Sequence, residues 1–80
     1  MPEITVYSRP NCQPCKFTIR KLESLGAEFR KIDVTEDDDA LDFIRSLGYK
    51  QAPVVVAGER HWSGYSPDKI TKAVADGADA

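Results

Sequence analysis

Two cysteines, Cys12 and Cys15, are the residues of this sequence whose type and spacing could do chemistry, and the chain holds no others. A cysteine thiolate attacks a disulfide to form a mixed disulfide, and a second nearby thiol can resolve it. In a reducing compartment a C-x-x-C pair is more often catalytic or metal-binding than structural. The spacing therefore indicates a dithiol redox centre or part of a metal site.

Pro14 places this pair at the beginning of a helix. Proline is favoured in the first helical turn, and it disfavours the helical conformation in the residue before it. We therefore expect the helix to begin at Pro14, with Gln13 near its cap and Cys12 just outside. There the positive end of the helix dipole can lower the pKa of a cysteine from about 8.5 to roughly 3.5–7.5. Cys15 lies on the apolar stripe of the helix, so Cys12 is expected to attack and Cys15 to resolve.

The neighbouring residues leave few other uses for the pair. A zinc site needs four ligands, and the other strong candidate in the chain is His61. Haem attachment would need a histidine after the second cysteine, where the sequence has Lys16. An iron–sulfur cluster shared between two chains stays open, but for a single chain we expect no metal and no cofactor. Arg9 and Lys16 either favour the thiolate electrostatically or are ordinary solvated cations.

Composition limits the other classes of function. The 80 residues are 41% hydrophobic and 30% charged, as in one small domain spanning residues 1–80. The net charge of −2 comes from interspersed acidic and basic residues, which leaves no basic patch for nucleic acid. No apolar run approaches the roughly 20 residues that span a bilayer, and no signal peptide is recognisable. We therefore expect a cytoplasmic monomer that binds neither nucleic acid nor membranes.

Hydrophobic periodicity and turn residues predict seven elements. The predicted strands are residues 3–7, 28–34, 53–57 and 60–62. The predicted helices run from Pro14 to a stop at Gly26, from an N-cap at Thr35 to a stop at Gly48, and onward from Ser66, Pro67 and Asp68. The first turn of the second predicted helix holds an acidic run, residues 36–39, which is favoured at a helix N-terminus and needs no binding function.

The order of these elements predicts an α/β fold. The weak pattern of residues 28–34 suits an edge strand, whereas the apolar run 53–57 is typical of a strand covered on both faces. Residues 58–59 fit a two-residue hairpin loop with glycine first. The order β-α-β-α-β-β-α then gives one four-stranded mixed sheet flanked by three helices, which is the minimal thioredoxin/glutaredoxin fold.

Two stretches of the sequence resemble known proteins, and together they cover nearly the whole chain. Residues 6–15, VYSRPNCQPC, resemble the active-site stretch of glutaredoxins. Residues 47–56, LGYKQAPVVV, followed by HWSGY at 61–65 and Pro67-Asp68, are similar to one subgroup, the NrdH-redoxins. The resemblance implies a redox carrier that takes electrons from thioredoxin reductase. It implies that this carrier passes them to the disulfide of the class Ib ribonucleotide reductase large subunit.

The resemblance also implies how a partner would dock. Pro53 would be cis and lie beside the redox pair, and the backbone of Ala52 would pair with an incoming peptide. The residues expected to bind or support a partner are Arg9, Gln13, Pro14, Ala52, Pro53, Trp62, Ser63, Gly64 and Tyr65.

The sequence departs from the glutaredoxin pattern in two places. Between the cysteines stand Gln13 and Pro14, which can change the redox potential. In the glutathione-binding stretch, Ser66 replaces the acid that would hold the glutathione amine, Ser63 replaces a glycine, and Tyr65 adds bulk. Arg9 keeps the place of a basic glutathione contact, so we expect weak glutathione binding. The alternative function is a glutaredoxin or mycoredoxin that uses a low-molecular-weight thiol, and a third is a metal-cluster carrier.

The aromatic residues divide into two expected groups. Trp62 is expected to be exposed at an interface or to lock the neighbouring loop, rather than simply to pack in the core. The aromatics expected in the core are Tyr7, Phe17, Phe29 and Phe43.

Overall fold

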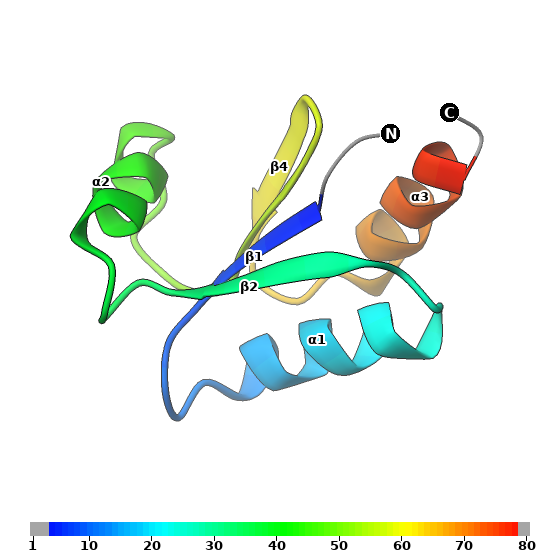
Figure 1. Ribbon diagram of the computed structural model, residues 1–80, viewed down its shortest axis with the longest axis horizontal. Helices are drawn as coiled ribbons and strands as arrows, with labels where there is room; N and C mark the ends of the chain where they lie inside the picture. Colours follow the sequence, from blue (N-terminus) through cyan, green and yellow to red (C-terminus); the bar gives the residue numbers. More distant parts are fainter. Residues whose placement is uncertain (1–3, 79–80) are drawn as a thin grey trace.

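The computed structural model describes the backbone of residues 4–78 and the side chains of residues 4–75. In chain order the elements are β1 (Ile4–Ser8), α1 (Gln13–Ser24), β2 (Phe29–Asp33), α2 (Asp38–Ser46), β3 (Val54–Ala57), β4 (Arg60–Ser63) and α3 (Pro67–Ala78), as Figure 1 shows. This order is the predicted β-α-β-α-β-β-α, so the fold prediction is confirmed.

The four strands form one mixed sheet in the order β2-β1-β3-β4. β1 runs parallel to β2 and antiparallel to β3, and β3 pairs antiparallel with β4. β2 is therefore an edge strand, as its weak pattern predicted. Tyr7 near the end of β1 pairs with Val54 at the start of β3. Because of this register, residues 52–53, which lead into β3, lie at the same end of the strands as the segment that follows β1 and carries the cysteines.

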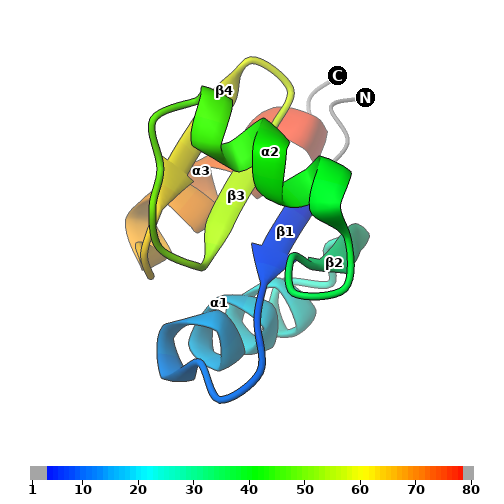
Figure 2. The same ribbon diagram turned by 90° about the vertical axis from the view of Figure 1, so that its left-hand side faces the viewer.

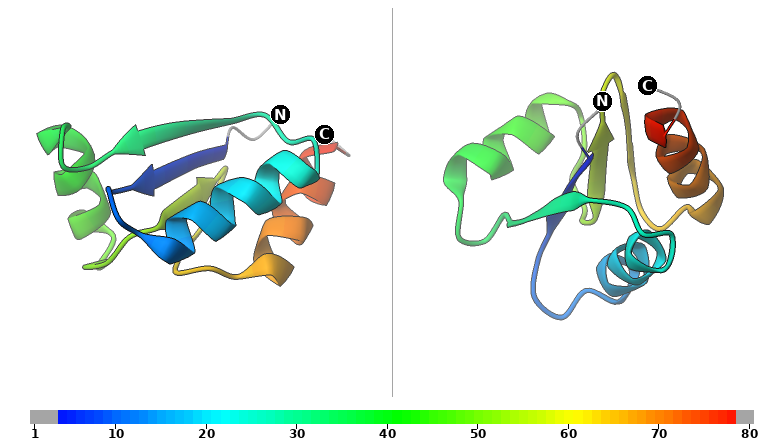
Figure 3. Two further views of the ribbon diagram at one scale, coloured as in Figure 1. Left: turned by 90° about the horizontal axis from the view of Figure 1, so that it is seen from below. Right: turned by 45° about the vertical axis from the view of Figure 1, so that its right-hand side comes forward.

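Helices cover both faces of the sheet. Figure 2 and Figure 3 show α2 on one face and α1 with α3 on the other. Apolar side chains from β1, β3, β4, α1 and α3 form the larger core, which consists of Ile4, Val6, Leu22, Val55, Ala57, Trp62, Ile70 and Ala73. The smaller core under α2 consists of Val34, Ala40, Ile44 and Val54. β3 contributes to both cores, which confirms that it is covered on both faces. No helix in the described part of the chain is both long enough and apolar enough to cross a bilayer.

The helix ends follow local signals, with one exception. Gly26 and Gly48 have φ values of +69° and +92° and follow α1 and α2, as predicted for helix stops. Thr35, however, is not the N-cap of α2. That place belongs to Asp37, whose carboxylate accepts from Ala40 N at 3.0 Å. The reason lies at Asp33, whose carboxylate accepts from both the backbone N and the hydroxyl of Thr35, at 2.8 and 2.6 Å.

Two of the four aromatics expected in the core are exposed instead. Tyr7 and Phe29 are half-buried, whereas Phe17 is 45% exposed and Phe43 is 41% exposed. The small domain has too little interior for every ring. Each of the two exposed rings packs at a tilt on another aromatic ring, Phe43 on Tyr7 and Phe17 on Tyr65.

Candidate active site

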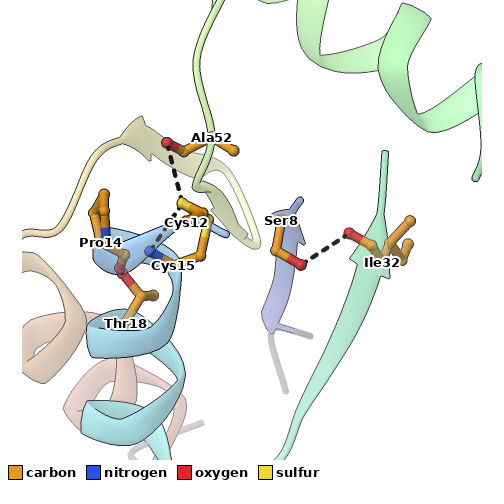
Figure 4. Close-up of a disulfide and its surroundings, with 7 residues drawn as sticks. All are labelled: Ser8, Cys12, Pro14, Cys15, Thr18, Ile32 and Ala52. Atoms are coloured by element: carbon orange, nitrogen blue, oxygen red, sulfur yellow. Dashed lines mark hydrogen bonds between the residues drawn. A yellow bond between two sulfur atoms is a disulfide. The ribbon is translucent and has the colours of Figure 1, made fainter. Parts of the chain in front are cut away.

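A disulfide joins Cys12 and Cys15 at the N-terminus of α1, as Figure 4 shows. Cys12 is the N-cap residue, with extended backbone angles of φ −112° and ψ 106°. Its Sγ accepts a hydrogen bond from the backbone N–H of Cys15 at 3.2 Å. Gln13 is the first helical residue and Pro14 the second. The helix therefore begins one residue earlier than predicted, and the position of Cys12 just outside it is confirmed.

Both sulfur-bearing residues are largely covered in this oxidised state. Cys15 is 2% exposed, which confirms that it faces the core, and Cys12 is only 5% exposed. Exposure alone therefore does not distinguish the two cysteines. Hydrogen bonding does, because the sulfur of Cys12 receives the N–H at the helix end. The prediction that Cys12 attacks and Cys15 resolves rests on this asymmetry.

The loop before β3 lies against the disulfide. The Ala52–Pro53 peptide bond is cis, as the family resemblance implied. The carbonyl oxygen of Ala52 is 3.8 Å from Cys12 Sγ, which is within reach of a weak S–H···O hydrogen bond once the thiol is reduced. On the other side, the carbonyl of Pro53 accepts from the N–H of Gly64 at 2.8 Å. Three segments distant in sequence thus converge at the redox pair.

The remaining predicted site residues fall into two groups. Arg9, Gln13, Pro14, Ser63 and Tyr65 are exposed near this edge of the sheet. Trp62 is different, because it is 5% exposed and belongs to the core under α1 and α3. The expectation of an exposed aromatic at this position is wrong. Along β4 the side chains alternate, and Trp62 occupies the inward place between exposed neighbours.

Phe17 packs on Tyr65, one of the predicted site residues, and the sequence interpretation had not placed it there. Its ring centroid is 5.7 Å from that of Tyr65, with the ring planes at 49°. The signal that could have identified it is helical spacing, since a residue two positions after the buried Cys15 points about 200° away from it. Helical spacing therefore places Phe17 on the solvent side of α1.

Two buried hydroxyls in the elements on either side of the cysteine loop, those of Thr18 and Ser8, donate hydrogen bonds to backbone carbonyls. Thr18 is 0% exposed and donates from its hydroxyl to the carbonyl of Pro14 at 2.8 Å, across the first turn of α1. Ser8 is 3% exposed and donates to the carbonyl of Ile32 at 3.5 Å, between β1 and β2 (Figure 4). Neither hydrogen bond was predicted, because serine and threonine occur at both buried and exposed positions and the hydrophobic pattern does not distinguish the two.

His61, the candidate third ligand of a metal site, lies on β4 and is engaged elsewhere. Its Nδ1 is 2.7 Å from the hydroxyl of Tyr49, and the two rings pack edge to face. Among the described side chains, residues 4–75, no three of histidine, cysteine, aspartate or glutamate gather in a way that could hold a metal ion.

The fold and the site together define a thioredoxin-fold protein with a dithiol–disulfide centre at the start of its first helix. Comparison with known proteins gives the family. The glutaredoxin family profile matches residues 4–62. The glutaredoxin-like protein NrdH of Salmonella typhimurium is 46% identical over 69 residues, covering 86% of this chain and 85% of the relative. The Escherichia coli NrdH protein is 41% identical over the same length and with the same coverage.

Solved structures agree with the sequence comparison. The NrdH-redoxin of Escherichia coli superposes with a TM-score of 0.85 at 40% identity, over 88% of this chain and 92% of that one. A glutaredoxin from Archaeoglobus fulgidus superposes with a TM-score of 0.81 at 29% identity, over 92% of this chain and 87% of that one. The chain belongs to the glutaredoxin family and, within it, to the glutaredoxin-like NrdH proteins.

Proposed function

We propose that this chain is a cytoplasmic electron carrier that reduces the disulfide of the class Ib ribonucleotide reductase large subunit. Thioredoxin reductase supplies its electrons from NADPH. The chain acts as a monomeric redox carrier with thiol–disulfide oxidoreductase activity, and it needs no bound cofactor. Family membership supports this class of function, and the arrangement around Cys12 supports the mechanism.

The observation that carries the proposal is the setting of Cys12 Sγ. The N–H of Cys15, 3.2 Å away, and the helix dipole both favour the thiolate over the thiol, because each stabilises negative charge. The cis-proline loop lies on the other side of the sulfur, at 3.8 Å from the Ala52 carbonyl. A partner peptide that paired with this loop would bring its own disulfide to the nucleophile.

The exchange transfers two electrons to the partner, whose two sulfurs take up one proton released by Cys15 and one from solvent. The Cys12 thiolate attacks one sulfur of the partner disulfide, that S–S bond breaks, and the second partner sulfur leaves as a thiolate that takes up a proton. The Cys15 thiol then loses its proton, and its thiolate attacks Cys12 Sγ. The first partner sulfur leaves and is protonated, so the partner is a dithiol and the chain holds its Cys12–Cys15 disulfide.

The choice of thioredoxin reductase as donor rests on the loop between β4 and α3. Glutathione carries a free amine that a carboxylate would hold, and position 66 is a half-buried serine. The ring of Tyr65 projects beside it and packs on Phe17. The solved relative from Escherichia coli is described as having a thioredoxin-like activity profile, which supports the same donor for this chain.

The second candidate is a glutaredoxin or mycoredoxin that uses a low-molecular-weight thiol. One observation favours it, which is that Arg9 is exposed three residues before Cys12 and is free to hold a thiol's carboxylate. The two functions differ in the reductase that regenerates the dithiol.

NADPH oxidation in two parallel reactions tests the proposal. Both contain the purified protein and a disulfide substrate. One contains thioredoxin reductase, and the other contains glutathione with glutathione reductase. We expect turnover with thioredoxin reductase and little with glutathione. Cys12→Ser is the matched control and should abolish turnover. Turnover with glutathione alone would establish the second candidate instead.

A further inference from the structure

Phe17 and Tyr65 form an exposed aromatic pair on the surface of the described domain. Four large apolar residues are exposed there, Phe17 at 45%, Phe43 and Tyr65 at 41%, and Leu25 at 37%. Phe17 and Tyr65 pack on each other with ring centroids 5.7 Å apart, although one comes from α1 and the other from the loop before α3. Together they present a continuous apolar surface that would gain free energy by being covered.

Both rings belong to segments that adjoin the redox centre. Phe17 follows Cys15 by two residues along α1. Tyr65 follows Gly64, whose N–H bonds to Pro53 at 2.8 Å, next to the Ala52 carbonyl that lies 3.8 Å from Cys12 Sγ. A peptide held at the cis-proline loop with its disulfide at Cys12 would therefore have neighbouring side chains beside the two rings.

Cations outnumber acids around the pair, although the whole chain has a net charge of −2. Asp68 and Lys69, in the first turn of α3 after Tyr65, offset each other. Arg9 and Lys16 flank the cysteines, both are exposed, and neither forms an ion pair with a described residue. The first turn of α1 holds no acid, and along the chain from residue 9 the first acid is Glu23. Asp33 is next to Ser8 in the sheet, but its carboxylate accepts from Thr35.

We propose that Phe17 and Tyr65 are a docking platform for an apolar side chain next to the partner's disulfide, and that this partner segment is acidic. The apolar side chain covers the two rings, and the carboxylates of the segment lie near Arg9 and Lys16. Charge complementarity selects the acidic segment, because like charges facing each other disfavour a basic one. This inference rests on the proposed thiol–disulfide exchange and names the kind of segment that the site accepts.

The structure supplies a matched control for the platform. Phe43 on α2 is exposed to nearly the same extent as Phe17, and it packs on Tyr7 with a centroid distance of 5.6 Å and an interplanar angle of 45°. The helix that carries it, α2, lies on the opposite face of the sheet from α1 (Figure 3). Leu25, at the far end of α1, is a second control.

The test measures single-turnover reduction of three synthetic disulfide peptides of equal length. One is acidic with leucine beside each cysteine, one is acidic with serine in those places, and one is basic with leucine. The protein is reduced beforehand and freed of reductant, and the reaction is quenched with acid and followed by chromatography. Hydroxyethyl disulfide, which is small and uncharged, reports whether the wild-type dithiol exchanges at all.

We expect the wild-type protein to reduce the acidic leucine peptide about tenfold faster than the serine peptide, as for one buried apolar anchor. The ratio of the two rates should fall towards one in Phe17→Ala and should be unchanged in Phe43→Ala and Leu25→Ala. Lys16→Ala should narrow the preference for the acidic over the basic peptide, and added salt should do the same.

Two results would overturn the platform. One is equal wild-type rates with the leucine and serine peptides, and the other is an equal loss of the ratio in folded Phe17→Ala and Phe43→Ala. Failure of the wild-type protein to reduce hydroxyethyl disulfide would instead contradict the proposed exchange function itself.

Discussion

The backbone N–H of Cys15 donates a hydrogen bond to Sγ of Cys12 at 3.2 Å. The N-cap acceptor of α1 is therefore a sulfur, whereas in most helices it is a side-chain oxygen. In the oxidised protein this contact holds a disulfide sulfur. In the reduced protein the same N–H faces a thiol or a thiolate. Because this hydrogen bond is stronger to a thiolate than to a thiol, the interaction that caps α1 also favours the reactive, ionised form of Cys12.

We expect selective alkylation of Cys12 in the reduced protein. Iodoacetamide reacts with thiolates, so its rate as a function of pH reports the pKa of each cysteine. The midpoint for Cys12 should lie below the ordinary value of about 8.5. Cys15 should react much more slowly, because the N–H at the helix end stabilises the thiolate of Cys12 and not that of Cys15. Peptide mapping after partial labelling identifies the modified residue. Equal labelling of both cysteines with a midpoint near the ordinary value would contradict the assigned roles.

Asn11, immediately before Cys12, holds a left-handed conformation with φ +58°. A β-branched residue cannot adopt this conformation without a cost of about 1–2 kcal/mol, whereas glycine adopts it freely. We therefore expect Asn11→Val to lower the free energy of unfolding by about that amount. Asn11→Gly should change it little. Urea unfolding of the oxidised proteins measures both, and a valine variant as stable as the glycine variant would refute the argument.

Substitutions of Trp62 test whether this residue stabilises the core or binds a partner. Its side chain is buried in the core, and its indole N–H has no hydrogen-bond partner among the described residues. Trp62→Ala should cost about 3–5 kcal/mol of stability because it leaves a large cavity. Trp62→Phe should cost much less, since it removes an unsatisfied donor along with some volume. Disulfide reductase activity of the folded phenylalanine variant should persist. Loss of activity without loss of stability would restore an interface role.

The pKa of Asp33 lies below its ordinary value because the hydroxyl and then the backbone N–H of Thr35 donate to its carboxylate. The folded state thus prefers the ionised form. This preference contributes stability above the unfolded-state pKa and disappears as the pH falls through the lower folded-state pKa. Compared with Asp33→Asn, the wild-type protein should lose relative stability as the pH drops below about 3.8. Urea unfolding at several pH values above and below this point measures the free energy of unfolding of both proteins. A difference between them that does not change with pH would contradict the assignment.

Local signals in the sequence were sufficient for most of the fold. The apolar run of β3 and the glycines after α1 and α2 each act within a few residues, and these predictions were confirmed. Pro14 placed the start of α1 to within one residue. The N-cap of α2 was mispredicted because a side chain outside the helix competed. Asp33 engages Thr35, and the helix therefore begins after Asp37.

The site was predictable where its chemistry is encoded in spacing, and not where it depends on tertiary packing. Cys12 and Cys15 follow from one motif and one proline. The pairing of Phe17 with Tyr65 depends on how α1 meets the loop before α3, which no local pattern contains. The burial of Trp62 likewise depends on which face of β4 lies under the helices.

The central claim is that Cys12 attacks the ribonucleotide reductase disulfide and Cys15 resolves the intermediate. Trapping tests this most directly. The variant Cys15→Ser, incubated with the oxidised class Ib reductase large subunit, should accumulate a covalent complex that thiol reductants release, and mass spectrometry should locate the bond at Cys12. The double variant Cys12→Ser with Cys15→Ser should give no complex. No adduct with Cys15→Ser, or an adduct equally abundant with Cys12→Ser alone, would contradict the account.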